Sequence, residues 1–336
     1  MSTLNEILVN KNNCSQSVWF MRQAGRYLPE FRNIRSQNKD FIKLCLNSDL
    51  SSEITLQPIK RFNLDSAIIF SDILLVPYAL GQKVDFIKNE GPVLSQFNIN
   101  NFHKNDKSLF VKKLKPVHEA IIKTRKKLSK EKSLICFVGA PWTLLIYMLG
   151  LKADKDKINF SKLKKEKGNI KIILNLLVEY LCVHIEEQFN AGADVVQIFD
   201  SWAGLIPEED LVDLCYKPNL TLVNFCKTKK FPVICFPKGI KEKYLEFCNI
   251  VKPNGINLDY DINIMWAKKN LTNITLQGGM SPKFLLKTDL EMFNEANKYL
   301  DTFRDVPYIF NLGHGIVPET NPEKVEKLIN YVKDFK

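Results

Sequence analysis

With 336 residues, 45% of them hydrophobic and 25% charged, the chain has the composition of an ordinary soluble globular protein, and its net charge at pH 7 is +11. That charge would suit a nucleic-acid partner, but the lysines are spread over many segments, and the densest stretches, 123–132 and 152–167, mix both signs of charge as solvated surfaces do. The eight cysteines form no Cys-x-x-Cys pair, so we expect reduced thiols. The first residues do not resemble an export signal, and no segment reaches the roughly 18 uncharged apolar residues of a membrane span. We therefore expect a cytoplasmic protein with no membrane partner.

Short apolar runs that end abruptly in polar residues or glycine recur along the chain and predict strands. There are eight of them, in chain order Val18–Met21, Ser66–Phe70, Leu134–Val138, Val195–Phe199, Val233–Phe236, Gly255–Leu258, Ile274–Gln277 and Tyr308–Asn311. Helical periodicity fills the intervals, as in Ile172–Phe189, where apolar residues recur every three or four positions before the stop at Asn190–Ala193.

Short buried strands that alternate with helices indicate a parallel sheet, and eight such units favour a closed (β/α)8 TIM barrel over an open sheet. No glycine-rich G-x-G-x-x-G turn follows the first strand, so the strongest sign of a dinucleotide-binding fold is missing. We therefore expect one α/β barrel domain that spans residues 1–336 and has its active site at the carboxyl ends of the strands.

The ends of the eight expected strands carry polar residues that a barrel would bring to one face. In chain order they are Arg22–Gln23, Ser71–Asp72, Gly139–Trp142, Asp200–Ser201, Pro237–Lys238, Asp259, Gln277–Gly278 and Gly313–His314. This set contains no nucleophile beside an obvious base, and His314 has no neighbouring metal ligands, so neither a catalytic triad nor a metal site is expected.

Arginine is concentrated at one of these strand ends. Four of the seven arginines, Arg22, Arg26, Arg32 and Arg35, fall within fourteen positions, whereas lysine supplies 41 of the 48 basic residues in the whole chain. Arginine holds a carboxylate or phosphate through two parallel hydrogen bonds, which lysine cannot do. The cluster predicts an anion-binding site, although Arg32 fits a surface position equally well.

Several motifs, in the same order along the chain, resemble those of the uroporphyrinogen decarboxylase family. They are Trp19–Arg35, Asp65–Leu74, Gly139–Leu144 with Tyr147, Phe199–Gly204 and Asn311–Gly315. The resemblance covers nearly the whole chain and implies a cofactor-free carboxy-lyase of haem biosynthesis. Such an enzyme removes four acetate carboxylates from uroporphyrinogen III to give coproporphyrinogen III, and relatives suggest a homodimer.

The resemblance also assigns expected roles to single residues. Asp72, Arg22 and Tyr147 match catalytic positions, with the Asp72 carboxylate stabilising positive charge on a protonated pyrrole. The further substrate-binding positions that it implies are Gln23, Arg26, Arg35, Ser201 and His314. Without the resemblance, an aspartate such as Asp72 after a strand is more often a helix cap, and Ser201 could likewise cap a helix that starts near Pro207.

One loop departs from the family pattern. The segment Gln277–Pro282 has Gly279 and Ser281 where relatives more often have asparagine and aspartate, so this loop is in doubt as a source of polar side chains. Two other functions remain open from the sequence. A zinc-dependent methyltransferase of the same barrel superfamily would need a His-x-Cys type of ligand set, which this chain lacks, and a nucleic-acid-binding protein would need interleaved aromatic and basic positions.

Overall fold

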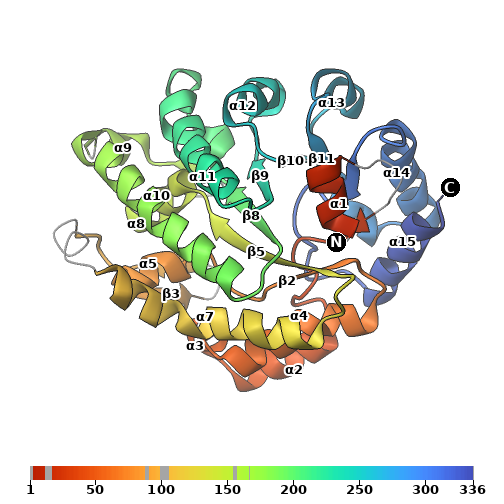
Figure 1. Ribbon diagram of the computed structural model, residues 1–336, viewed down its shortest axis with the longest axis horizontal. Helices are drawn as coiled ribbons and strands as arrows, with labels where there is room; N and C mark the ends of the chain where they lie inside the picture. Colours follow the sequence, from red (N-terminus) through yellow and green to blue (C-terminus); the bar gives the residue numbers. More distant parts are fainter. Residues whose placement is uncertain are drawn as a thin grey trace.

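Eight parallel strands, surrounded by helices, form a nearly closed barrel in the computed structural model, which describes residues 3–11, 17–87, 91–98, 106–153, 157–165 and 167–335 (Figure 1). The strands are β1 (Ser17–Val18), β2 (Ser66–Ile68), β5 (Ser133–Gly139), β8 (Val195–Asp200), β9 (Val233–Pro237), β10 (Gly255–Leu258), β11 (Thr275–Gly278) and β12 (Tyr308–Phe310). Their order in the sheet is β1-β12-β11-β10-β9-β8-β5-β2, and neighbouring strands in this order are parallel. The predicted (β/α)8 TIM barrel is confirmed.

Helices follow the strands and cover the outside of the barrel (Figure 1). The α-helices of the described residues are α1 (Thr3–Asn10), α2 (Pro29–Gln37), α3 (Phe41–Cys45), α4 (Ser48–Arg61), α5 (Leu75–Ala79), α7 (Lys107–Lys127), α8 (Pro141–Met148), α9 (Phe160–Lys165), α10 (Lys167–Asn190), α11 (Lys217–Thr228), α12 (Tyr244–Val251), α13 (Ile264–Asn270), α14 (Asp289–Thr302) and α15 (Pro322–Asp334). Shorter turns are η1 (Ala203–Leu205), η2 (Glu208–Asp210), the π-helical η3 (Val212–Tyr216), η4 (Lys241–Lys243) and η5 (Pro282–Leu286).

Local sequence sets several helix starts. The Asn47 side chain accepts hydrogen bonds from two backbone N–H groups at the start of α4, and Thr288 and Glu291 form a reciprocal capping box at α14. The predicted helix Ile172–Phe189 is confirmed inside α10. By length and composition 168–190 would also suit a membrane span, but α10 packs against α7 and α11 as a helix of the outer ring.

Two hairpins interrupt the barrel pattern. Strands β3 (Val84–Ile87) and β4 (Gly91–Leu94) pair antiparallel, and so do β6 (Lys152–Ala153) and β7 (Lys157–Ile158). The second hairpin and α9 occupy the lysine-rich stretch 152–167, of which residues 154–156 and 166 lie outside the described part of the chain.

The first strand is shorter than predicted. We expected it to run from Val18 to Met21, but the strand ends at Val18, and this expectation was wrong. Beyond Val18 the backbone pairing with β12 is partly replaced by side-chain contacts, since the Met21 N–H donates to Asn311 Oδ1 (3.2 Å), and the chain then turns at Arg22, whose φ is +60°. Residues 19–21 are apolar because Trp19 and Met21 belong to the interior core and Phe20 packs in the outer core with Val18.

Asp65 joins the two strands at the ends of the sheet order, β1 and β2. Its backbone N–H donates to the carbonyl of Val18 (3.1 Å), and its carboxylate accepts from the Val18 N–H (2.8 Å). The other carboxylate oxygen accepts from Lys333 of α15 (2.8 Å), which balances the charge of this partly buried acid. One side chain therefore brings the two edges of the barrel together.

Alternate strand residues face two separate cores, as expected when a sheet closes on itself. Outward-facing residues such as Val18 and Val196 pack under the helices. Inward-facing residues form a smaller interior core that α1 completes from the amino end of the strands, and its members are Leu4, Ile7, Leu8, Trp19, Met21, Ile68, Ile135, Val195, Ile234, Phe236 and Ile309. With the amino end filled by α1, the carboxyl ends of the strands are the face left for a site.

Candidate active site

Arg22 lies at the carboxyl end of β1 in a strained conformation. A positive φ is uncommon for a residue with a Cβ, and such strain is concentrated at functional sites. The Arg22 side chain passes over Gly315, in the loop after β12, so closely that a Cβ on Gly315 would collide with Arg22 Cδ. A hydrogen bond from the Ile316 N–H to the Met21 carbonyl (3.0 Å) holds the same two segments together. These contacts therefore fix the position of the Arg22 backbone, from which the guanidinium extends.

Three other polar groups surround this guanidinium. Burial and the positive charge of Arg26 lower the pKa of Arg22, whereas Asp72 and Tyr147 act in the opposite direction and raise it. Arg22 still touches solvent, but crowding by protein atoms on its other sides shifts its pKa. In the described part of the chain neither Arg22 nor Arg26 has a hydrogen-bond acceptor for its side chain, so both guanidinium groups are available to bind an external anion.

Asp72 combines a local turn with a weakened acidity. One carboxylate oxygen accepts the Leu74 N–H (2.8 Å) in a turn just before α5, but the N-cap of α5 is Leu74 and this helix has no side-chain cap, so Asp72 is not the helix cap that the alternative interpretation expected. Burial raises the Asp72 pKa from 3.8 to about 6, while the Leu74 bond and the charge of Arg22 act to lower it. The carboxylate form therefore dominates at pH 7 by about ten to one. Its second oxygen has no hydrogen-bond partner among the described residues and is available to a ligand.

Arg35 and Arg32 occupy different environments. Arg35 donates to the Asn38 carbonyl and lies 5.7 Å from the centre of the Phe41 ring. Burial raises the pKa of Cys45, and the charges of Asp72 and Arg35 also act on it, so both charged groups lie within electrostatic range of this thiol at the end of α3. Arg32 instead donates to the carbonyls of Arg26 (3.0 Å) and Tyr27 (2.9 Å) on the surface.

Gln23 lies beneath the arginines and is completely buried. Its amide nitrogen donates to the Ser66 carbonyl (3.0 Å), and its amide oxygen accepts the Phe20 N–H (3.0 Å). Both ends of the side chain thus bind backbone, one at β1 and one at β2. This arrangement fixes the turn that presents Arg22.

The remaining expected residues come from β8, α8 and the loop after β12. The Tyr147 ring lies edge-on to the Trp202 ring, with 6.0 Å between centres. Ser201 is exposed, and η1 and η2 begin without any side-chain cap, so the capping alternative for Ser201 is not observed. His314 Nδ1 accepts the Gly315 N–H (2.8 Å), which places the proton of the neutral ring on Nε2.

Two buried carboxylates at strand ends have roles that the sequence did not assign. Asp200 accepts hydrogen bonds from Thr143 (2.7 Å), Asn219 (3.3 Å) and Cys215 (3.4 Å), and burial raises its pKa to about 6. Asp259 similarly accepts from the Tyr244 hydroxyl (3.0 Å) and from a backbone N–H. The only sign in the sequence was that Asp200 and Asp259 directly follow strands. That position does not distinguish a carboxylate that anchors the next helix from one that binds a ligand.

The structure explains the departure in the loop after β11. Gly279 has φ at +108°, and the Tyr299 ring occupies the space that a Cβ would need. The Tyr299 hydroxyl donates to the Gly279 carbonyl (2.8 Å), so the Tyr299 side chain fills the space that a side chain at position 279 would need. Ser281 caps η5 by accepting the Lys283 N–H. This loop is thus stabilised by the Tyr299 side chain of α14 and by the Ser281 cap within the loop itself.

No group of three or more His, Cys, Asp or Glu side chains in the described chain is placed to hold a metal ion. The cysteines described are all free, and five of the seven are buried. The groups that the structure brings together at the carboxyl face are therefore cations, a carboxylate and hydroxyls, a set suited to an anionic substrate and proton transfer.

Comparison with known proteins adds independent information. Residues 6–335 match the family model described as uroporphyrinogen decarboxylase (URO-D). A protein of that name from Orientia tsutsugamushi (strain Ikeda) is 39% identical over 342 residues, covering 100% of this chain and 99% of its own length. Proteins of the same name from Wolbachia pipientis wMel and Rickettsia bellii (strain RML369-C) are 39% and 40% identical over 321 residues. Each match covers 95% of this chain and 94% of the relative.

Solved structures share the fold at much lower identity. A methyltransferase from Methanosarcina mazei superposes with a TM-score of 0.80 at 16% identity, covering 99% of this chain and 98% of its own. A B12-independent methionine synthase from Shewanella sp. W3-18-1 has a TM-score of 0.54 at 12% identity, with 85% of each chain covered. Likeness at this level shows a common barrel and carries nothing about chemistry.

Proposed function

This chain belongs to the uroporphyrinogen decarboxylase family, and from that premise we propose that the polar groups around Arg22 form its decarboxylation site. The activity is that of a carboxy-lyase acting on uroporphyrinogen, as in the relatives that match nearly all of the chain. One observation carries the proposal for the site. Arg26, Asp72 and Tyr147 all influence the pKa of the Arg22 guanidinium, so the four groups lie within electrostatic range of one another.

The arginines hold the carboxylates of the substrate. Uroporphyrinogen has eight carboxylates, and Arg22 and Arg26 repel each other in the free protein, which lowers the Arg22 pKa. A carboxylate bound between them relieves that repulsion, and each charge-assisted hydrogen bond contributes about 1.5 to 3 kcal/mol. Arg35 binds a further carboxylate: its guanidinium lies by the Phe41 ring, donates to the Asn38 carbonyl and, like Asp72, acts on the Cys45 thiol.

The substrate itself accepts the electrons of the breaking bond. A proton added to the pyrrole α-carbon next to the carbon that bears the acetate makes the ring cationic, and as CO2 leaves, the electron pair of the breaking C–C bond forms a double bond from the methylene to the ring. Protonation of the resulting methylene and loss of the ring proton leave a methyl group, with one proton consumed per acetate. The Asp72 carboxylate stabilises the cationic ring through its N–H groups, using the oxygen that Leu74 does not occupy.

The other expected residues act around this step. Tyr147 and Ser201 bind the reacting acetate or relay its proton, and His314 donates from Nε2 to a substrate carboxylate. The donor of the ring proton is Arg22 or a water molecule that it holds, since burial and Arg26 both lower the Arg22 pKa. Gln23 acts on the substrate through Arg22, because both ends of its amide bind backbone.

The direct test is anaerobic incubation with uroporphyrinogen III, followed by oxidation and separation of the porphyrins by carboxylate number. We expect species with seven, six, five and four carboxylates to appear without any added cofactor. If only the octacarboxylate is recovered, the assignment fails. Arg26→Gln should raise the KM for uroporphyrinogen, and an unchanged KM would remove Arg26 from the site.

The assembly and location of the protein belong to the same proposal. The protein acts in the cytoplasm as a homodimer of single-domain subunits, as the family resemblance and the buried free cysteines support. Light scattering on the purified protein should give twice the 38.8 kDa mass of the chain, and a monomer at assay concentrations would contradict the dimer. One cooperative unfolding transition is expected for a single domain.

A further inference from the structure

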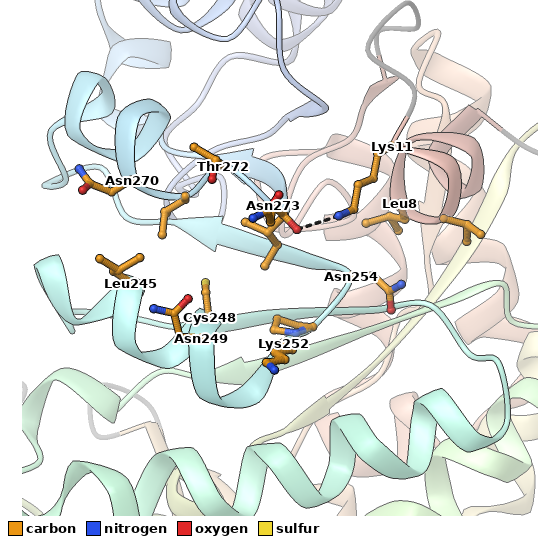
Figure 2. A pocket seen from close by; sticks show the side chains of 14 residues that line it. Leu8, Lys11, Leu245, Cys248, Asn249, Lys252, Asn254, Asn270, Thr272 and Asn273 are labelled. Carbon is orange, nitrogen blue, oxygen red and sulfur yellow. Dashed lines mark hydrogen bonds between the residues drawn. The ribbon is translucent and has the colours of Figure 1, made fainter.

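A cleft of about 440 Å³ lies at the opposite end of the barrel from the proposed active site (Figure 2). It opens between α1, α12 and the segment that connects α13 to β11, close to the amino ends of β10 and β11. In Figure 2 the side chains of Leu245, Cys248 and Asn249 approach it from α12, and those of Asn270 and Thr272 from the opposite wall. The cleft has the volume of a site for a small molecule.

The charge of this cleft has one sign. Its 14 lining residues include Lys11 and Lys252 and no aspartate or glutamate. Neither lysine makes an ion pair within the described chain. Lys11 Nζ donates only to the carbonyl of Asn273 (2.8 Å), and the charge of Lys252, together with burial, lowers the pKa of its neighbour Lys227. Positive charge is thus left uncompensated at the cleft.

Both lysines also have an unfavourable backbone conformation. Lys252 ends α12 with φ at +52°, and Lys11 follows α1 with φ at +51°. Glycine is the usual residue at such a helix end, because a Cβ is strained at positive φ. Lys230 and Lys241 share this conformation without lining the cleft, so Lys11 and Lys252 are distinguished by their position at the two helix ends that border one cleft, and not by backbone strain.

The walls of the cleft suit an apolar body. Val9 and Leu245 contribute aliphatic surface, and the nearby polar groups are mostly carboxamides. Asn254 accepts the Val233 N–H through its side-chain oxygen (3.0 Å), which leaves its amide donors for another partner. Two lysines cannot neutralise a tetrapyrrole with eight carboxylates, so the family's substrate is a poor match for this cleft.

We propose that this cleft binds a small organic carboxylate with an apolar body, its carboxylate held by Lys11 and Lys252 and its body against Val9 and Leu245. Such a ligand would connect α1 with α12. Because Thr275 of β11 donates to the Ile7 carbonyl (3.0 Å) and α1 fills the amino end of the barrel, the ligand would also hold α1 in place. Bound ligand should therefore raise the resistance of the protein to unfolding.

Equilibrium dialysis with radiolabelled phenylacetate tests the proposal, with phenylacetamide as the uncharged competitor. We expect the radiolabelled phenylacetate to bind the wild-type protein saturably. Unlabelled phenylacetate should displace it, and phenylacetamide should not. Lys252→Gly and Lys11→Gly should each weaken binding by about tenfold or more, the factor expected for loss of a charge-assisted hydrogen bond. Both variants should unfold at the same or a higher urea concentration than the wild type, since glycine removes the strain at positive φ.

Two controls separate this cleft from other basic surfaces. Lys230 also has a positive φ, at +58°, but does not line the cleft, so Lys230→Gly should bind phenylacetate as the wild type does. Arg26→Gln alters the proposed active site and should likewise leave phenylacetate binding unchanged. The proposal is overturned if wild-type protein shows no saturable binding, if the Lys11 and Lys252 variants bind normally, if phenylacetamide competes equally, or if Arg26→Gln abolishes binding.

Discussion

Replacing Asp72 with asparagine should stabilise the protein at neutral pH and abolish decarboxylation. Burial raises the pKa of Asp72 from 3.8 to about 6, so the folded state binds this proton more tightly than the unfolded state does. The resulting stability is present at low pH and is lost as the pH rises from about 4 to 6. A difference of 6 minus 3.8 pKa units corresponds to a cost of about 3 kcal/mol above pH 6.

Asparagine cannot ionise, and its side-chain oxygen can still accept the Leu74 N–H. We therefore expect Asp72→Asn to raise the free energy of unfolding at pH 7.5 by up to about 3 kcal/mol, and the difference from wild type to vanish near pH 4. Urea unfolding at both pH values measures this. Turnover of uroporphyrinogen should fall by about a hundredfold or more, because an uncharged group no longer stabilises the cationic pyrrole.

Asp200→Asn is the matched control. Burial raises the Asp200 pKa to about 6 as well, but its carboxylate accepts hydrogen bonds from Thr143, Cys215 and Asn219. An asparagine N–H₂ would face one or more of these donors, so this variant should be less stable than wild type. The reasoning is refuted if Asp72→Asn is destabilised at pH 7.5, if its stabilisation does not depend on pH, or if it decarboxylates at a near-normal rate.

Three further predictions concern the same site. Arg22→Lys keeps the positive charge but loses the planar guanidinium, and it should remove most of the activity. The control Arg304→Lys, at an exposed arginine on another part of the chain, should leave kcat/KM unchanged. Equal kinetics for both variants would show that the geometry of Arg22 is unimportant. Gly315→Ala should displace the Arg22 side chain and lower kcat/KM while CD spectra stay native, and full activity would show that the close approach is dispensable. The value of kcat/KM should fall as the pH drops below about 6, because Asp72 then takes up a proton, and a flat profile down to pH 5 would count against a carboxylate role for Asp72.

The sequence alone determined the architecture and the general nature of the site. Eight apolar runs alternating with helical segments predicted a barrel, and seven of the eight strands lie close to the predicted ranges because a buried parallel strand must be apolar on both faces. The excess of arginine at 22–35 predicted an anion site, and the ordered motifs indicated the family that the comparisons show. These signals are local in the chain, so no tertiary contact was needed to recognise them.

Only the tertiary structure decided how single residues are used. Arg22, Arg32 and Gln23 have similar positions in one motif, yet Arg22 is open to a ligand, Arg32 binds carbonyls and Gln23 joins β1 to β2. The early end of β1, the replacement of a side chain at Gly279 by Tyr299 and the charged cleft beside Lys252 likewise depend on segments far apart in sequence. Burial and electrostatic fields are set by all neighbouring atoms in space, and a linear pattern records only the neighbours along the chain.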